Sequence, residues 1–191
     1  MKLVFATHNK NKFREVKAQM PSHIELLSLT DINCFDDIAE TEDTIEGNAL
    51  LKARYVKDHF GIDCFADDSG LEVEALDNAP GVYSARYAGP EKDANANNRK
   101  LLDELQKESN RAARFKTVIA LTTAEGEKLF TGLCPGVIVK SPRGEGGFGY
   151  DPLFQPDGYD RTFAEMPLSL KTEIGHRGKA IAQLLEYLKV E

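Results

Sequence analysis

The chain has 191 residues, which suits one domain at the usual ~150 residues per domain. It is 41% hydrophobic and 29% charged, a balance typical of a protein with a real core. With 24 Lys and Arg against 31 Asp and Glu, the net charge of −7 argues against bulk binding to nucleic acid or an anionic membrane. The longest run without a charged side chain, Leu129–Val139, is shorter than the ~18 residues of a membrane span.

The first third of the chain predicts a strand and two helices. Lys2–Ala6 has the apolar pattern of a short buried strand, and the helix expected after it ends before Pro21. A second helix is expected to begin near Asp43, whose spacing to Glu46 is that of a capping box. Gly61 follows the last periodic residue and is expected to end that helix.

The middle of the chain predicts strands on either side of an acidic turn, and then a helix. Cys64–Ala66 indicates a short strand that ends in a turn at Asp67–Gly70. Leu71–Ala75 alternates in the way of a half-exposed strand. The segment Asp93–Lys107 predicts a helix with a leucine-rich face.

The last third predicts a hairpin, a glycine-rich loop and a final helix. Arg114–Thr123 and Lys128–Val139 are strand-like runs joined by a short polar turn. The loop covers Ser141–Tyr150, and the final helix has four apolar residues at helical spacing: Ile181, Leu184, Leu185 and Leu188. Because strands and helices interleave and one hairpin is antiparallel, the expected fold is α/β with a mixed sheet.

The first segment that could carry chemistry is Ala6–Lys12, at the join of a strand and a helix. Backbone N–H groups at a helix start attract anions, and Thr7, Asn9 and Lys12 add donors and a charge. One interpretation is a phosphate site, and the other is an ordinary helix cap with a solvated lysine. The spacing of a P-loop is absent.

The second segment holds two adjacent carboxylates, Asp67 and Asp68. Neighbours on an extended backbone point to opposite sides, so one can face Mg²⁺ while a basic partner holds the other. The alternative is an exposed acidic turn. Glu40 could complete a metal site or simply favour the start of the next helix. Lys52, on that helix, is a candidate phosphate cation or a surface lysine.

The third segment, Gly144–Gly149, has the spacing of a dinucleotide-binding loop but not its setting. That fingerprint opens a helix, whereas Pro152 follows here and disfavours one. What remains is a loop that presents Phe148 between glycines. An aromatic side chain so placed can stack on a nucleobase, or it can anchor the loop to the core.

Three basic residues near the start of the last helix form the fourth candidate. Lys171, His176 and Arg177 offer hydrogen-bond donors to a carbonyl oxygen or a phosphate. The alternative for the pair His176 and Arg177 is simple solvation at the surface.

Taken in chain order, these segments resemble the inosine triphosphate pyrophosphatase family, whose members hydrolyse noncanonical purine nucleoside triphosphates. The resemblance covers nearly the whole chain and is carried by the following motifs: Ala6–Glu15, Phe65–Leu71, Pro80–Tyr87, Gly146–Pro152, Thr162–Glu165 and His176–Gly178. It implies a single domain over residues 1–191. The implied fold is α/β, with two lobes around a long mixed β-sheet, flanking helices and an active-site cleft between the lobes.

The resemblance also implies an activity and its setting. The activity is Mg²⁺-dependent hydrolysis of ITP, dITP and XTP to the monophosphate and pyrophosphate, which cleanses the nucleotide pool. The implied enzyme is a cytoplasmic homodimer with a purine nucleoside triphosphate as substrate and with no nucleic-acid or membrane partner. The three cysteines, which lack CxxC spacing, also indicate reduced thiols in a cytoplasmic protein.

Site roles follow from the same resemblance. Asp68 is implied to be the proton acceptor and, with Glu40, a ligand of Mg²⁺. The substrate-binding residues implied are Thr7, His8, Asn9, Lys10, Asn11, Lys12, Lys52, Ser69, Phe148, Gly149, Tyr150, Asp151, Lys171, His176 and Arg177.

Two positions depart from the family pattern, and two other functions stay open. Gly47 stands where a glutamate is common, which is expected to thin the acidic shell, and Gly175 replaces a serine, which is expected to loosen its turn. One alternative function is a Maf-like pyrophosphatase acting on modified pyrimidine or guanine nucleotides. The other is a non-catalytic nucleotide-binding module, which has little need of a water-activating carboxylate.

Overall fold

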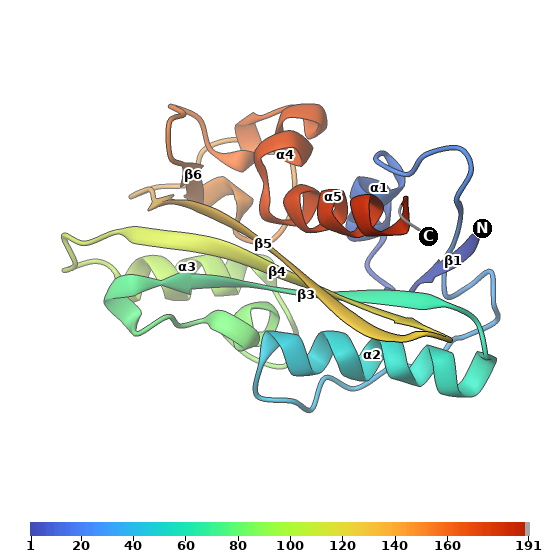
Figure 1. The fold of residues 1–191 in the computed structure, drawn as a ribbon. Coiled ribbons are helices and arrows are strands. Elements are labelled where there is room, and N and C mark those ends of the chain that lie inside the picture. Colours follow the sequence, from blue (N-terminus) through green and yellow to red (C-terminus); the bar gives the residue numbers. More distant parts are fainter. Residues whose placement is uncertain (190–191) are drawn as a thin grey trace. The chain divides into compact units, whose positions relative to one another are not determined.

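The structure, a computed structural model, describes residues 1–189 and contains one mixed β-sheet with helices (Figure 1). The strand order is β2-β1-β3-β4-β5-β6. The bounds are β1 (Lys2–Phe5), β2 (Glu25–Leu27), β3 (Cys64–Val73), β4 (Ala112–Thr123), β5 (Gly126–Ile138) and β6 (Phe154–Pro156). Strand β1 pairs in parallel with β2 and β3, whereas β5 pairs antiparallel with β6. The expected α/β fold with a mixed sheet is therefore confirmed.

The chain divides into two compact units. Unit 1 comprises Met1–Asp68, Thr117–Gly132 and the chain from Arg177 onward, and unit 2 comprises Ser69–Lys116 and Leu133–His176. Among the described residues, no helix is long and apolar enough to cross a membrane.

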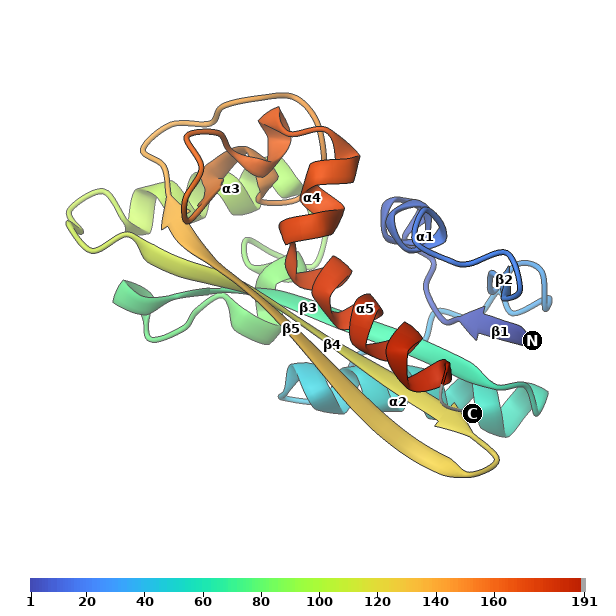
Figure 2. The same cartoon turned by 45° about the horizontal axis from the view of Figure 1, so that its top comes forward.

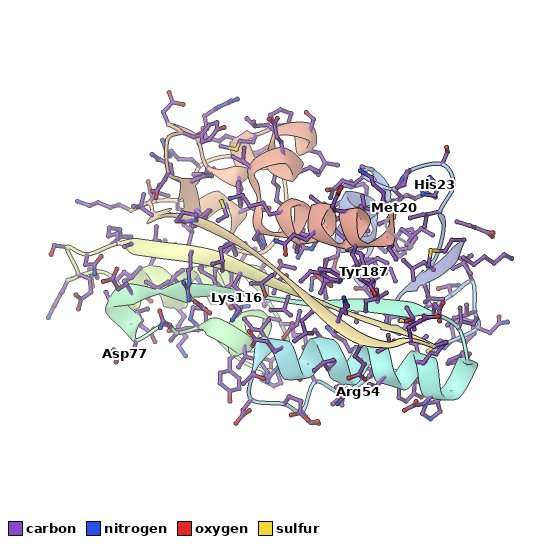
Figure 3. All side chains as sticks on the ribbon, in the orientation of Figure 1. Met20, His23, Arg54, Asp77, Lys116 and Tyr187 are labelled. Carbon is purple, nitrogen blue, oxygen red and sulfur yellow. The ribbon has the colours of Figure 1, made fainter. Side chains whose placement is uncertain are left out.

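Unit 1 packs helices on both faces of its strands. Its helices are α1 (Lys10–Lys17), α2 (Ile45–Phe60) and, from Arg177 on, α5 (His176–Leu188). In both ribbon views α2 covers one face of the strands and α5 the other (Figures 1 and 2). Buried apolar side chains of α1, α5 and the strands form one core cluster. At its edge Tyr187, labelled in Figure 3, packs 5.8 Å from the ring of Phe130.

The helix ends of unit 1 follow from their capping residues. The side chain of Asn9 accepts hydrogen bonds from the backbone N–H groups of Asn11 and Lys12, which starts α1. Thr44 caps α2 by accepting from the N–H of Gly47, so the cap lies one residue beyond the predicted Asp43. Gly61 ends α2 in the left-handed conformation, at φ +68°, as predicted.

Unit 2 is built around aromatic side chains. It holds α3 (Ala94–Glu104), α4 (Leu168–Ile174) and four short 3₁₀ segments, Glu74–Leu76, Gly81–Arg86, Asp151–Leu153 and Phe163–Glu165. The rings of Phe115, Phe154 and Phe163 contact one another, with centroids 4.6–5.8 Å apart, and belong to its buried core. Asp93 caps α3, which is shorter at its end than predicted.

Two predictions about the middle and end of the chain are wrong. Asp67–Gly70 is not a turn, because β3 runs without a break from Cys64 to Val73. Lys171 lies not on the last helix but on the separate helix α4, which ends at Ile174 and is followed by Gly175. The strands β2 and β6 were not predicted, since three residues each are too few to show a period.

Candidate active site

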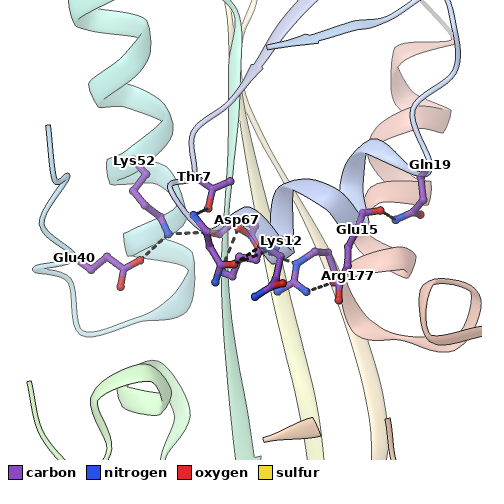
Figure 4. A network of polar contacts seen from close by, with 10 residues as sticks. Thr7, Lys12, Glu15, Gln19, Glu40, Lys52, Asp67 and Arg177 are labelled. Atoms are coloured by element: carbon purple, nitrogen blue, oxygen red, sulfur yellow. Dashed lines mark hydrogen bonds and ion pairs between the residues drawn. The ribbon is translucent and has the colours of Figure 1, made fainter. Parts of the chain in front are cut away.

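The two adjacent carboxylates lie inside β3 and are both buried. Asp67 is 1% exposed and Asp68 is 6% exposed, so the alternative of an exposed acidic turn is wrong. Asp67 accepts an ion-pair contact from Nζ of Lys12 at 3.3 Å and a hydrogen bond from Nε of Arg177 at 3.0 Å (Figure 4). Two cations from α1 and α5 therefore balance this charge inside unit 1.

Arg177 joins a second carboxylate to the same network. One N–H of its guanidinium donates to Oε2 of Glu15 at 2.6 Å, and the Arg177 side chain is 4% exposed (Figure 4). The alternative of a solvated surface arginine is therefore wrong. Sequence reasoning gave Glu15 no role, although a glutamate beside Val16 on the apolar side of a helix is a signal of a buried partner.

The electrostatics of this network separate the two aspartates. Burial alone would raise the pKa of Asp67, but the charges of Lys12, Arg177 and Lys52 hold it well below its usual range. Burial raises the pKa of Asp68 to about 6, with Lys52 and Lys12 opposing that rise. Adjacent residues of one strand thus have opposite titration behaviour, which is typical of catalytic carboxylates.

Lys52 links α2 to the carboxylates. Its Nζ donates to Oε1 of Glu40 at 2.7 Å and to the backbone oxygen of Asp67 at 2.6 Å (Figure 4). Burial would lower the pKa of Lys52, but the charges of Asp68, Glu40 and Asp67 raise it. Lys52 is therefore a buried cation of the site and not a surface lysine.

The same carboxylates are the candidates for a divalent cation. Among the residues that the structure describes, no three His, Cys, Asp or Glu side chains are grouped to hold a metal by themselves. The charge of Glu40 raises the pKa of Asp68, so these two carboxylates lie within electrostatic reach of each other. Mg²⁺ is usually bound by one or two carboxylates together with substrate phosphates, and this donor set fits such a shared ion.

The candidate phosphate segment forms the start of α1. The hydroxyl of Thr7 accepts from the N–H of Asn9, and Asn9 caps the helix. Nε2 of His8 donates to the backbone oxygen of Asp36 at 2.8 Å, because a carbonyl only accepts. Lys10 and Asn11 follow in the first turn. Asn9 caps the helix as expected, and the partly buried Lys12 is paired with Asp67, so this lysine is not simply solvated.

In unit 2 the glycine-rich loop meets Lys171. Nζ of Lys171 donates to Oδ2 of Asp151 at 2.7 Å and lies 4.7 Å from the ring centre of Phe148. Oδ2 of Asp151 also accepts from the N–H of Phe148 at 3.0 Å. A Cβ on Gly147, at φ +68°, would lie 2.1 Å from that oxygen, so the loop requires glycine there.

His176, Tyr150 and Asn98 are held by further contacts within unit 2. The ring of His176 is 5% exposed and stacks on Phe115 with centroids 4.6 Å apart, so it is not a surface histidine. Tyr150 donates its hydroxyl to the backbone oxygen of Ser84, and Asn98 donates to that of Gly149. Sequence reasoning missed Asn98, whose only signal is a polar residue on the buried side of α3.

The predicted site residues divide between the units. Thr7–Lys12, Glu40, Lys52, Asp68 and Arg177 belong to unit 1. Ser69, Phe148–Asp151, Lys171 and His176 belong to unit 2.

The two glycines that depart from the family pattern, Gly47 and Gly175, both lie where the chain packs closely on itself. A Cβ on Gly47 would lie 2.8 Å from Cβ of Glu42, so this part of α2 packs closely on the segment before it. A Cβ on Gly175 would lie 2.4 Å from the backbone oxygen of Lys171. The N–H of Gly175 donates to that same oxygen at 2.8 Å, so the turn is tight and not loosened.

This fold and its buried carboxylates and lysines define an α/β protein equipped for phosphate chemistry. The profile of the Ham1 family matches residues 3–187, and the chain belongs to that family. It is 61% identical to a dITP/XTP pyrophosphatase of Christiangramia forsetii over 188 residues, covering 98% of this chain and 99% of the relative. It is 57% identical to one of Flavobacterium johnsoniae, covering 98% of both. A solved Ham1 protein of Coxiella burnetii is 37% identical with a TM-score of 0.92, and all of each chain is covered.

Proposed function

We propose that this protein is a nucleoside triphosphate pyrophosphatase that converts ITP, dITP and XTP to the monophosphate and pyrophosphate. The observation that carries the proposal is the pair of adjacent buried carboxylates with opposite pKa shifts, Asp67 and Asp68. The dITP/XTP pyrophosphatase names of the relatives give the same reaction and substrate class.

Asp68 is the proton acceptor in this proposal. With a pKa of about 6 it is ionised at pH 7, yet it is a stronger base than an ordinary aspartate. It takes a proton from the water that attacks a phosphorus of the triphosphate, and pyrophosphate leaves. Asp67 cannot do this, because its charge is neutralised by Lys12 and Arg177 and its pKa is held low.

The phosphate end of the substrate is assigned to the start of α1 and to two lysines. Thr7–Lys12 supply side-chain donors at the helix start, whose backbone N–H groups at Asn11 and Lys12 are used by the Asn9 cap, and Lys12 and Lys52 supply positive charge. Glu40 and Asp68 would hold Mg²⁺ together with the phosphates. When bound, that ion neutralises charge that develops on the phosphate oxygens.

The base end is assigned to residues of unit 2: Ser69, Phe148–Asp151, Lys171 and His176. Arg177, which the family resemblance assigns to the same end, belongs to unit 1 and pairs there with Asp67 and Glu15. The ring of Phe148 stacks on the purine, and donors read the oxygen at C6. Adenine has an amino group there, so it would leave buried donors unpaired, which costs about 1–3 kcal/mol for each group. His176, a buried donor of unit 2, takes this role together with nearby backbone N–H groups.

The setting of the enzyme is part of the proposal. A cytoplasmic location is supported by three cysteines that are all buried and form no disulfide. The homodimer is proposed from the family resemblance alone. The net charge of −7 supports the absence of nucleic-acid and membrane partners.

The deciding experiment is pyrophosphate release with Mg²⁺ across ITP, dITP, XTP, GTP and ATP, with modified pyrimidine nucleotides added to the panel. The expected result is release of pyrophosphate with the first three strongly preferred. Preference for the pyrimidines would favour a Maf-like enzyme, and tight binding without release would favour a non-catalytic module. Either result would overturn the proposal.

A further inference from the structure

A polar stripe on α2 holds the segment that carries Glu40. We define the strap as residues Asp36–Glu42, which lie between β2 and α2 and contain no helix or strand. Asn48, Lys52 and Tyr55 are spaced at i, i+4 and i+7, so they lie on one face of α2. Each of the three contacts a different part of the strap.

The contacts run along the strap in order. Oδ1 of Asn48 accepts from the N–H of Glu42 at 3.0 Å, and its Nδ2 donates to the oxygen of Glu42 at 3.4 Å. Lys52 binds the carboxylate of Glu40 at 2.7 Å, as Figure 4 shows. One turn further, the hydroxyl of Tyr55 donates to Oδ2 of Asp36 at 2.7 Å.

Asp36 is held from a second side as well. Nε2 of His8, in the candidate phosphate segment, donates to the backbone oxygen of Asp36 at 2.8 Å. Asp36 itself is exposed, and neither it nor Tyr55 belongs to the buried charge network. The contacts of the two residues fix one end of the strap to both α2 and the start of α1.

We propose that Tyr55 and Asp36 are positioning residues that fix the strap and thereby hold the Glu40 carboxylate in place. This inference rests on the proposed function, because Glu40 matters there as a ligand of Mg²⁺. An irregular segment loses conformational freedom when it is ordered, and a ligand that is already ordered binds its ion without that cost. Asn48 and Lys52 still hold the other end, so the expected effects are moderate.

The first test measures the strap directly, in the absence of nucleotide and metal. Hydrogen–deuterium exchange is followed for peptides covering residues 36–42 in the wild type, Tyr55→Phe, Asp36→Ala and the double variant. Exchange is expected to be about three- to ten-fold faster in each single variant. The double variant is expected to show no further increase, because both substitutions remove the same hydrogen bond between Tyr55 and Asp36. Arg54→Gln is the matched control, since Arg54 lies on the same helix and pairs with Glu127 instead.

The second test asks whether the effect passes through Glu40. The Mg²⁺ concentration for half-maximal pyrophosphate release is expected to rise about three- to ten-fold in Tyr55→Phe, with kcat at saturating Mg²⁺ nearly unchanged. In a Glu40→Gln background, Tyr55→Phe is expected to change the Mg²⁺ requirement no further.

Two results would overturn the inference. One is exchange over residues 36–42 that is the same in Tyr55→Phe as in Arg54→Gln. The other is an equal change of the Mg²⁺ requirement with and without Glu40. If the wild type released no pyrophosphate from ITP, the proposed function would fall, while the exchange experiment would still decide whether Tyr55 and Asp36 hold the strap.

Discussion

The two units bury different kinds of side chain. Unit 1 joins the partly buried Lys12 to the buried Asp67, Arg177 and Glu15 in one network of opposite charges. Unit 2 places aromatic rings beside a buried ion pair, between Lys171 and Asp151. The first arrangement suits a highly charged ligand such as a triphosphate, and the second suits a flat ring with a few polar edges.

Within unit 1, two neighbouring buried carboxylates of one strand differ in the same way: burial acts to raise the pKa of both, and the charges beside each decide the outcome. Asp67 has two cations in direct contact, and its pKa stays low despite burial. At Asp68 the penalty of burial exceeds the help of nearby lysines, and its pKa rises. Ionised Asp68 therefore lowers the stability of the folded protein, and the same burial makes this carboxylate a stronger base.

The largest expected effect tests the charge network of unit 1. Arg177→Met keeps most of the side-chain volume but leaves Asp67 and Glu15 without their shared cation. Breaking a buried ion pair in this way costs about 3–5 kcal/mol of unfolding free energy. Urea denaturation measures the loss, with Arg54→Gln as the control, because the exposed pair of Arg54 and Glu127 is worth at most about 1 kcal/mol. Similar losses in both variants would contradict the assignment of a buried network.

The next effect is on catalysis. Asp68→Asn keeps the size of the side chain and removes its basicity, so kcat with ITP is expected to fall about 10²-fold or more. Steady-state kinetics compares it with Asp63→Asn, which changes a partly exposed aspartate of the same unit that pairs with Lys57. A wild-type kcat in Asp68→Asn would show that Asp68 is not the proton acceptor.

The same substitution is expected to stabilise the protein at neutral and alkaline pH. Because the folded pKa of Asp68 is about 6 and the ordinary value is 3.8, folding favours the protonated form. Ionised Asp68 therefore costs up to about 3 kcal/mol above pH 6 and nothing below about pH 4. Urea denaturation of Asp68→Asn should show a gain at pH 8 that disappears at pH 4. A loss of stability at pH 8 would mean that Asp68 is not strained by burial.

A smaller effect is expected in unit 2. If the ring of Phe148 stacks on the purine, Phe148→Ala should raise KM for every purine triphosphate alike, because stacking does not depend on the group at C6. Stacking is worth about 1–3 kcal/mol per base, so a rise of about ten-fold or more is expected. Phe148→Tyr, which keeps a ring, is the control. A rise confined to ITP would indicate that Phe148 reads the base edge instead.

Local sequence signals predicted many of the helices and strands, but they did not predict the contacts between residues that are far apart in the sequence. Gly61 and Asp93 are visible as helix boundaries because capping depends on adjacent residues. The continuous strand β3 was hidden, since Asp67 and Asp68 resemble a turn until Lys12 and Arg177 are placed beside them. Those partners lie far away in the sequence, and a pattern of neighbouring residues cannot predict such contacts.

In the candidate site, too, the contacts between distant residues could not be predicted from the sequence. The residue types and their order indicated phosphate chemistry, but they did not indicate that Lys52, Lys171 and His176 are buried. Glu15, Asn98 and the pair of Tyr55 and Asp36 escaped notice, because each acts through a contact that only the fold creates.

The central claim is that unit 1 handles phosphate and unit 2 reads the base. The most direct measurement is kcat/KM for ITP, XTP, GTP and ATP in Lys12→Met and His176→Phe, with folding checked by thermal denaturation. His176→Phe keeps a ring against Phe115 and removes the donors. Lys12→Met is predicted to lower all four values by a similar factor, whereas His176→Phe is predicted to lower the ITP and XTP values more than the ATP value. A changed ITP/ATP ratio in Lys12→Met with an unchanged ratio in His176→Phe would contradict the claim.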